Sequence, residues 1–79
     1  MEDFMKTLVA NDFDLVEDSY DAVSYNKDAT DGTSETFTFL TTEKSVLHER
    51  YNKNGVQTYS SNVPMKESFL INKMFASFR

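Results

Sequence analysis

The chain has 79 residues, which is room for one small domain, so we expect a single domain spanning residues 1–79. It contains no cysteine, which excludes a disulfide framework and a cysteine-ligated metal site. Seven phenylalanines and four tyrosines argue against a disordered chain, because they suffice to fill a small core. The sequence has no apolar run long enough to cross a membrane, and its start, Met1-Glu2-Asp3, lacks a basic signal region. We therefore expect a cytoplasmic protein with no membrane contact.

The net charge of −5 is unevenly distributed along the chain. Residues 1–40 contain ten acids and two bases, a net charge of −8, whereas residues 41–79 contain three acids and six bases, a net charge of +3. Such asymmetry is typical of an acidic or basic interaction surface. It is also compatible with two halves that neutralise each other when they pack together.

The first expected element is a short amphipathic helix over residues 2–10. Phe4, Met5 and Leu8 fall on one stripe of such a helix, and this stripe would face the core. Asn11 follows as a residue that tolerates the left-handed conformation, so we expect it to end the helix.

Residues 12–60 have the pattern of antiparallel strands. Alternation of polar and apolar residues predicts strands at 12–15 and 20–25, although residues 12–24 also fit a single helix; poor helix formers favour the hairpin. Further strands are expected at 35–42, 45–52 and 56–60, and Asn52-Lys53-Asn54-Gly55 is a hairpin turn.

Pro64 is expected to begin a C-terminal helix, because proline is tolerated in a first helical turn. The helix would be apolar on two sides, with Met65 and Phe69 on its outer face available to a partner. The predicted fold class is α+β: an N-terminal helix, an antiparallel meander of four to five strands and a C-terminal helix, with both helices on one sheet face. The expected core consists of Phe4, Met5, Leu8, Leu15, Val23, Phe37, Phe39, Leu47, Tyr51, Ile71, Met74, Phe75 and Phe78.

Catalytic and metal chemistry find little support in the residues. His48 is the only histidine. On the expected strand at 45–52 its side chain would point away from the core residue Leu47, which predicts a solvated surface side chain. A calcium loop fails whether it starts at Asp12 or at Asn26, because neither start places glycine at the sixth position. The two glycines cannot form a phosphate-binding loop. We therefore expect no enzyme activity, no cofactor and no metal, and the anionic net charge makes nucleic-acid binding an unfavourable alternative.

An acidic segment near the N-terminus is the strongest candidate for a binding surface. Its carboxylates would form one negative face that attracts a partner protein with a basic surface. An acidic face that serves solubility alone is the competing interpretation. The candidate residues are Asp12, Asp14, Glu17, Asp18 and Asp21.

The run from Asp12 to Tyr20 and the later Phe37-Thr38-Phe39, set between two expected helices, resemble a group of known proteins. These are small uncharacterised proteins encoded by phages and prophages of Gram-positive bacteria. The resemblance implies an accessory protein that acts on another macromolecule, and such proteins include inhibitors of CRISPR and restriction systems. The resulting hypothesis is a phage-encoded inhibitor of a host factor. The alternative is a homo-oligomeric structural or nucleic-acid-associated protein that assembles through Met65 and Phe69.

Overall fold

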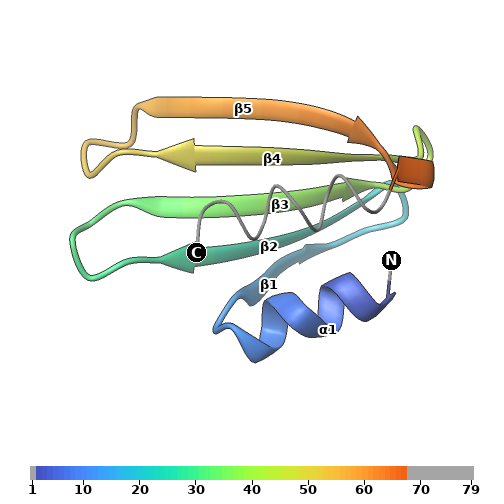
Figure 1. Cartoon of the computed structure of the whole chain (residues 1–79), viewed down its shortest axis with the longest axis horizontal. Helices are drawn as coiled ribbons and strands as arrows, with labels where there is room; N and C mark the ends of the chain where they lie inside the picture. Colours follow the sequence, from blue (N-terminus) through green and yellow to red (C-terminus); the bar gives the residue numbers. More distant parts are fainter. Residues whose placement is uncertain (1, 68–79) are drawn as a thin grey trace.

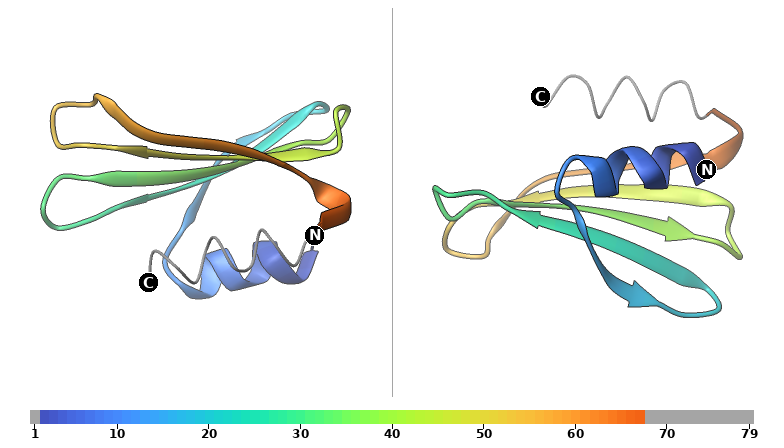
Figure 2. Two further views of the ribbon diagram at one scale, coloured as in Figure 1. Left: turned by 45° about the horizontal axis from the view of Figure 1, so that its top comes forward. Right: turned by 90° about the horizontal axis from the view of Figure 1, so that it is seen from below.

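The computed structural model describes residues 2–67 (Figure 1). Helix α1 is followed by five strands that form one antiparallel sheet in the order β1-β2-β3-β4-β5. In Figure 2 the sheet is twisted and α1 lies on one of its faces. The elements are α1 (Glu2–Ala10), β1 (Asp14–Asp18), β2 (Ala22–Asp28), β3 (Ser34–Leu40), β4 (Ser45–Tyr51), β5 (Gln57–Pro64) and the short 3-10 helix η1 (Met65–Glu67).

The core forms where α1 meets the middle of the sheet. Phe4 and Leu8 lie one turn apart on α1, and both side chains are buried, as the helical periodicity predicts. The ring of Phe4 contacts the rings of Phe37 and Phe39 edge to face, with centroids 5.3 and 6.0 Å apart. Phe13 packs against Phe37 in the same way at 5.7 Å. These edge-to-face contacts are the favoured geometry of aromatic pairs and connect the helix to the sheet.

On β4 the sequence prediction of the buried face is wrong. Phe37 pairs with His48 and Phe39 pairs with Val46, so His48 and Val46 share the α1-covered face. Leu47 therefore points to the opposite face, together with Tyr51. The register with the neighbouring strand decides which alternate side chains of a strand point to the core. Here that register outweighs the greater hydrophobicity of leucine over histidine.

The end of α1 also differs from the prediction by one residue. Asp12, with a φ of 70°, adopts the left-handed conformation expected of Asn11. The Asn11 side-chain Nδ2 instead donates to the Thr7 carbonyl at 2.8 Å, and its backbone N–H donates to the same oxygen. Asn11 thus extends the last turn, and the chain reverses at Asp12 to bring Phe13 under the helix.

The predicted hairpins are present. Residues 12–24 form the hairpin rather than a helix, because β1 pairs with β2. In the turn between β4 and β5, Asn52 Oδ1 accepts hydrogen bonds from the backbone N–H groups of Asn54 and Val56, and Gly55 has a φ of 78°. The turn between β2 and β3 packs beside it, and a Cβ atom on Gly32 would lie 2.9 Å from the Cβ of Lys53.

The predicted α+β fold class with two helices is corrected by the structure. Over residues 2–67 the chain is mainly an antiparallel sheet with one short α-helix. Pro64 ends β5 instead of starting a helix, because β5 continues to pair with β4 as far as Ser45. The remainder of the expected C-terminal helix, including the core candidates Ile71, Met74, Phe75 and Phe78, lies outside the described residues.

Several core assignments are also corrected. Leu15 was expected in the core, yet 51% of its surface is exposed because β1 is at the edge of the sheet. Phe13, Val46 and Val63, which were not expected in the core, are buried. Met5 and Val23 pack partly buried against the core as expected. Within residues 2–67, no helix has the length and apolar character needed to cross a membrane.

Candidate protein-binding site

Strand β1 forms one edge of the sheet and exposes every one of its side chains. Apolar and acidic residues alternate irregularly along it. Val16 is 61% exposed, and it lies where the register with β2 skips one residue between Leu15 and Glu17. Such a bulge turns an additional side chain outward. The edge therefore presents both carboxylates and aliphatic surface to solvent.

The turn that follows β1 is held firmly by the rest of the fold. Ser19 N–H donates to the Ala22 carbonyl at 2.9 Å. Thr41, in the loop after β3, donates its hydroxyl hydrogen to the Tyr20 carbonyl at 2.8 Å and its backbone N–H to the Asp21 carbonyl at 3.1 Å. The two bonds from Thr41 hold the backbone of the turn from a segment outside the hairpin.

Tyr20 stands out on this turn because 92% of its surface is exposed. A large aromatic side chain on a fixed backbone loses little conformational freedom when a partner binds, and tyrosine is enriched among residues that dominate binding energy. The single hydroxyl hydrogen of Ser19 has three acceptors within reach: the Ala22 carbonyl at 3.0 Å, Asp21 Oδ1 at 3.2 Å and Glu17 Oε2 at 3.5 Å, so two carboxylates lie close to this serine.

The five acidic residues of the predicted negative face are all exposed, but they follow one edge rather than one face. Asp14 and Glu17 lie on the face opposite α1, since they pair with Asn26 and Ser24, whereas Asp18 pairs with Val23 and lies on the α1 side. Asp12 precedes β1 and Asp21 lies in the turn after it. Glu17 and Asp21 both lie near the Ser19 hydroxyl. We call the surface formed by Asp14–Asp21 the acidic edge.

An apolar hollow adjoins the acidic edge on the α1 side. It has a volume of about 330 Å³ and lies between α1 and β2, with Met5, Val9 and Tyr25 supplying its apolar lining. Tyr25 is the cross-strand partner of Leu15, so the hollow continues onto the edge strand. Val9 is 57% exposed. Lys6 and Ala10 complete the lining, so the apolar surface is bordered by a cation of α1 as well as by the carboxylates of the edge.

The second predicted partner surface, Met65 and Phe69, is not an exposed helix face in the described region. Met65 belongs to η1, is partly buried and packs against the core. Its backbone N–H donates to the Lys44 carbonyl at 2.8 Å. Phe69 lies outside the described residues.

A buried ionisable pair is the feature that sequence reasoning missed. His48 has no exposed surface, and its Nε2 lies 2.6 Å from Glu35 Oε2, whose residue is 4% exposed. The imidazole stacks on the Phe37 ring with centroids 4.1 Å apart, and Tyr59 contacts it edge to face at 5.3 Å. The prediction of a solvated His48 is therefore wrong. The missed signal is register: Glu35, Phe37 and His48 share a face only once β3 and β4 are paired.

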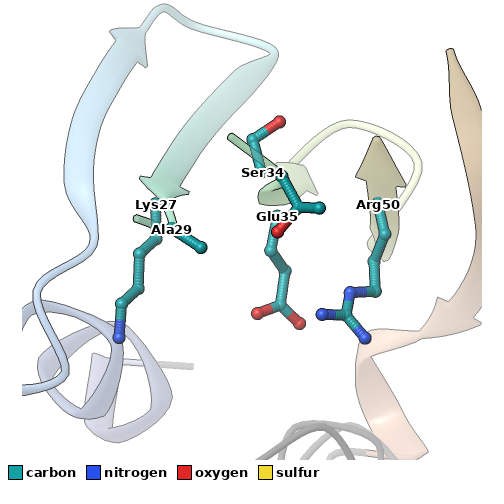
Figure 3. A pocket seen from close by; sticks show the side chains of 6 residues that line it. Lys27, Ala29, Ser34, Glu35 and Arg50 are labelled. Atoms are coloured by element: carbon teal, nitrogen blue, oxygen red, sulfur yellow. The ribbon is translucent and has the colours of Figure 1, made fainter. Parts of the chain in front are cut away.

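Above this pair lies a small hollow of about 160 Å³ near the turn between β2 and β3 (Figure 3). Lys27 and Arg50 stand on either side of Glu35, on β2 and β4 respectively. Two cations would attract an anion, but the Glu35 carboxylate between them offsets that charge. The hollow therefore completes the polar environment of the buried pair rather than forming an anion site.

Within residues 2–67, no group of three or more histidine or acidic side chains is arranged to hold a metal ion. Comparison of the chain with protein-family profiles, with curated proteins and with solved structures finds no match. The acidic edge, with Tyr20 at its end, is thus the site on which a functional proposal depends.

Proposed function

We propose that this protein is a protein-binding module that uses the acidic edge to hold a partner with a basic surface. The observation that carries the proposal is Tyr20, 92% exposed on a turn fixed by Thr41 and flanked by carboxylates. Aromatic contact would supply affinity, while the carboxylates of Glu17 and Asp18 would speed association and select a basic partner. The proposal includes neither catalysis nor a cofactor.

The biological setting of the proposal comes from the sequence resemblance alone. Small phage accessory proteins act by occupying a surface of a host protein, and a basic nucleic-acid groove of a CRISPR or restriction component is a surface that carboxylates fit. We propose inhibition of such a component in the host cytoplasm. Lysates of Gram-positive bacteria that encode these systems are therefore the first source of partners to test.

The test compares two variants that carry the same change in charge. Replacing Glu17 and Asp18 by lysine changes the net charge from −5 to −1, because each replacement adds two positive charges. Replacing Asp3 and Asp28 by lysine, both exposed and outside the acidic edge, has the same effect on net charge. We expect the first variant to lose the captured partner and the second to keep it, with release of the wild-type complex by moderate salt.

Two further measurements in the capture experiment test whether the Tyr20 ring contributes to binding and whether nucleic acid is involved. Tyr20→Ala leaves the charge unchanged and is expected to weaken binding of the captured partner by about 10-fold or more, as loss of a binding hot spot does. Nuclease treatment should leave capture intact. Equal capture by both lysine variants, or capture that disappears with nuclease, would contradict the proposal.

A further inference from the structure

The two edges of the sheet differ in how they are protected from pairing. Among the described strands, β1 and β5 each have a single neighbour, and an edge strand exposes unpaired backbone N–H and carbonyl groups. Strand β1 has five residues, three of them acidic, and a bulge. Short length, charge and bulges are the devices by which proteins prevent edge pairing. Strand β1 is therefore a protected edge.

The middle of strand β5 lacks these devices. The strand is the longest of the sheet, with eight residues, and none of its side chains carries a charge. Its irregular pairing with β4 is confined to its start, next to Gln57, and its only proline is its last residue, Pro64. The segment Tyr59–Val63 thus forms a regular, uncharged edge.

We propose that β5 pairs in antiparallel orientation with β5 of a second copy of this chain. A two-fold axis through Ser61 and perpendicular to the sheet would place Tyr59 opposite Val63 of the other copy. Both residues lie on the α1-covered face, since their partners on β4 are Arg50 and Val46. The pairing therefore places the α1-covered faces of the two sheets on the same side. Tyrosine opposite valine is a favourable cross-strand pair.

On the other face the same register places Ser60 opposite Asn62, two small polar side chains that are both exposed. Strand β5 carries no charge that would select a particular foreign partner. A second copy requires no such selection, because a two-fold interface only has to complement itself.

Long-range charge also favours this edge for self-association. Two molecules of net charge −5 repel each other, and the repulsion is smallest when their acidic parts are far apart. Joining two β5 strands leaves both acidic edges at the outer ends of a ten-stranded sheet. Figure 2 shows α1 on one face of the sheet rather than beside the outer edge of β5.

Sedimentation equilibrium of the full chain over a concentration series tests the proposal. The average mass is expected to rise from 9.1 kDa toward twice that value as the concentration increases. In the proposed register, Ser60→Lys with Asn62→Lys creates two like-charge pairs, as does Ser60→Glu with Asn62→Glu. Both variants should remain monomers. Ser60→Lys with Asn62→Glu creates two opposite-charge pairs and should dimerise at least as strongly as the wild type.

Comparing the three variants distinguishes loss of the proposed pairing from a general effect of charge and from unfolding. All three variants change the same two exposed positions, and circular dichroism confirms that each retains the sheet. Amide hydrogen exchange at Ser60 and Asn62, whose backbone N–H groups point away from β4, should slow as the wild-type concentration rises, whereas Ser61 N–H already bonds to β4 and should change less. A wild type that stays monomeric up to millimolar concentration would overturn the proposal, and so would a dimer that persists in both like-charge variants.

Discussion

Removing the imidazole of His48 is the sharpest test of what holds this small core together. In His48→Leu the volume is approximately kept, but Glu35, at 4% exposure, loses the hydrogen bond at 2.6 Å. Losing this buried hydrogen bond costs about 1–3 kcal/mol, because the imidazole is no longer available to an acceptor that has been removed from water. A chain of 79 residues is expected to have a total stability of about 4–12 kcal/mol. The substitution should therefore remove a substantial part of the free energy of unfolding.

Urea unfolding followed by circular dichroism measures this loss. We expect the midpoint to fall by roughly 1–2 M, with little change in slope. Glu49→Gln is the control, because Glu49 is half-buried on the other face and accepts one hydrogen bond, from Tyr51. It should cost about 1 kcal/mol or less. The double variant Glu35→Leu with His48→Leu should recover much of the loss. A cost below about 1 kcal/mol for His48→Leu would refute the reasoning.

Two further predictions concern the turns and the uncovered face. Gly32→Ala and Gly55→Ala both place a side chain at positive φ, at a cost of about 1–2 kcal/mol each, but only Gly32 also meets Lys53, at 2.9 Å. Gly32→Ala should thus be the more destabilising in thermal unfolding, and equal effects would show that the two turns do not press on each other. The hydrogen bond from Tyr51 to Glu49 raises the pKa of the Tyr51 hydroxyl above its ordinary value of about 10. This bond stabilises the fold below the unfolded pKa, and the contribution is lost as the pH rises through the higher folded pKa. Glu49→Gln should lower that pKa in an ultraviolet titration, with Tyr51→Phe identifying the transition; an unchanged titration would contradict this cause.

Local patterns predict much of the sheet. The alternation of Phe37 and Phe39 with threonines identifies β3, and Asn52 with Gly55 identifies the last turn, since both depend on a few neighbouring residues. The stripe of Phe4 and Leu8 likewise identifies α1 and its buried side. In these segments propensity and tertiary environment agree, so the sequence alone is sufficient.

Features set by distant residues could not be predicted in this way. Whether Val46 or Leu47 is buried depends on the register between β3 and β4, and a shift of one residue exchanges the two faces. The burial of His48 follows from the same register, because only pairing brings it to Phe37 and Glu35. The exposure of Leu15 depends on β1 being an edge strand, which hydropathy does not encode.

The candidate site shows the same division. Composition identifies the carboxylates near the N-terminus, but their grouping along an edge results from pairing with β2 and from the bulge at Val16. The sequence pattern places Tyr20 at the start of the strand at 20–25, whereas in the structure it lies in the turn before β2. Its importance comes from Thr41, twenty-one residues further along the chain, which fixes the turn and leaves the ring in solvent.

If both proposals hold, the protein binds its partner through two separated sites. In a dimer joined by β5, nine strand spacings separate the two acidic edges, a distance of about 43 Å. On a surface densely coated with partner, such a dimer should dissociate up to about 100-fold more slowly than a monomer. Ser60→Glu with Asn62→Glu gives the decisive comparison, because its added negative charge favours a basic partner while its like-charge pairs prevent dimerisation. Faster release than the wild type from the dense surface, with no loss of affinity for the partner in solution, would demonstrate two-site binding. Release as slow as that of the wild type would show that one acidic edge acts alone.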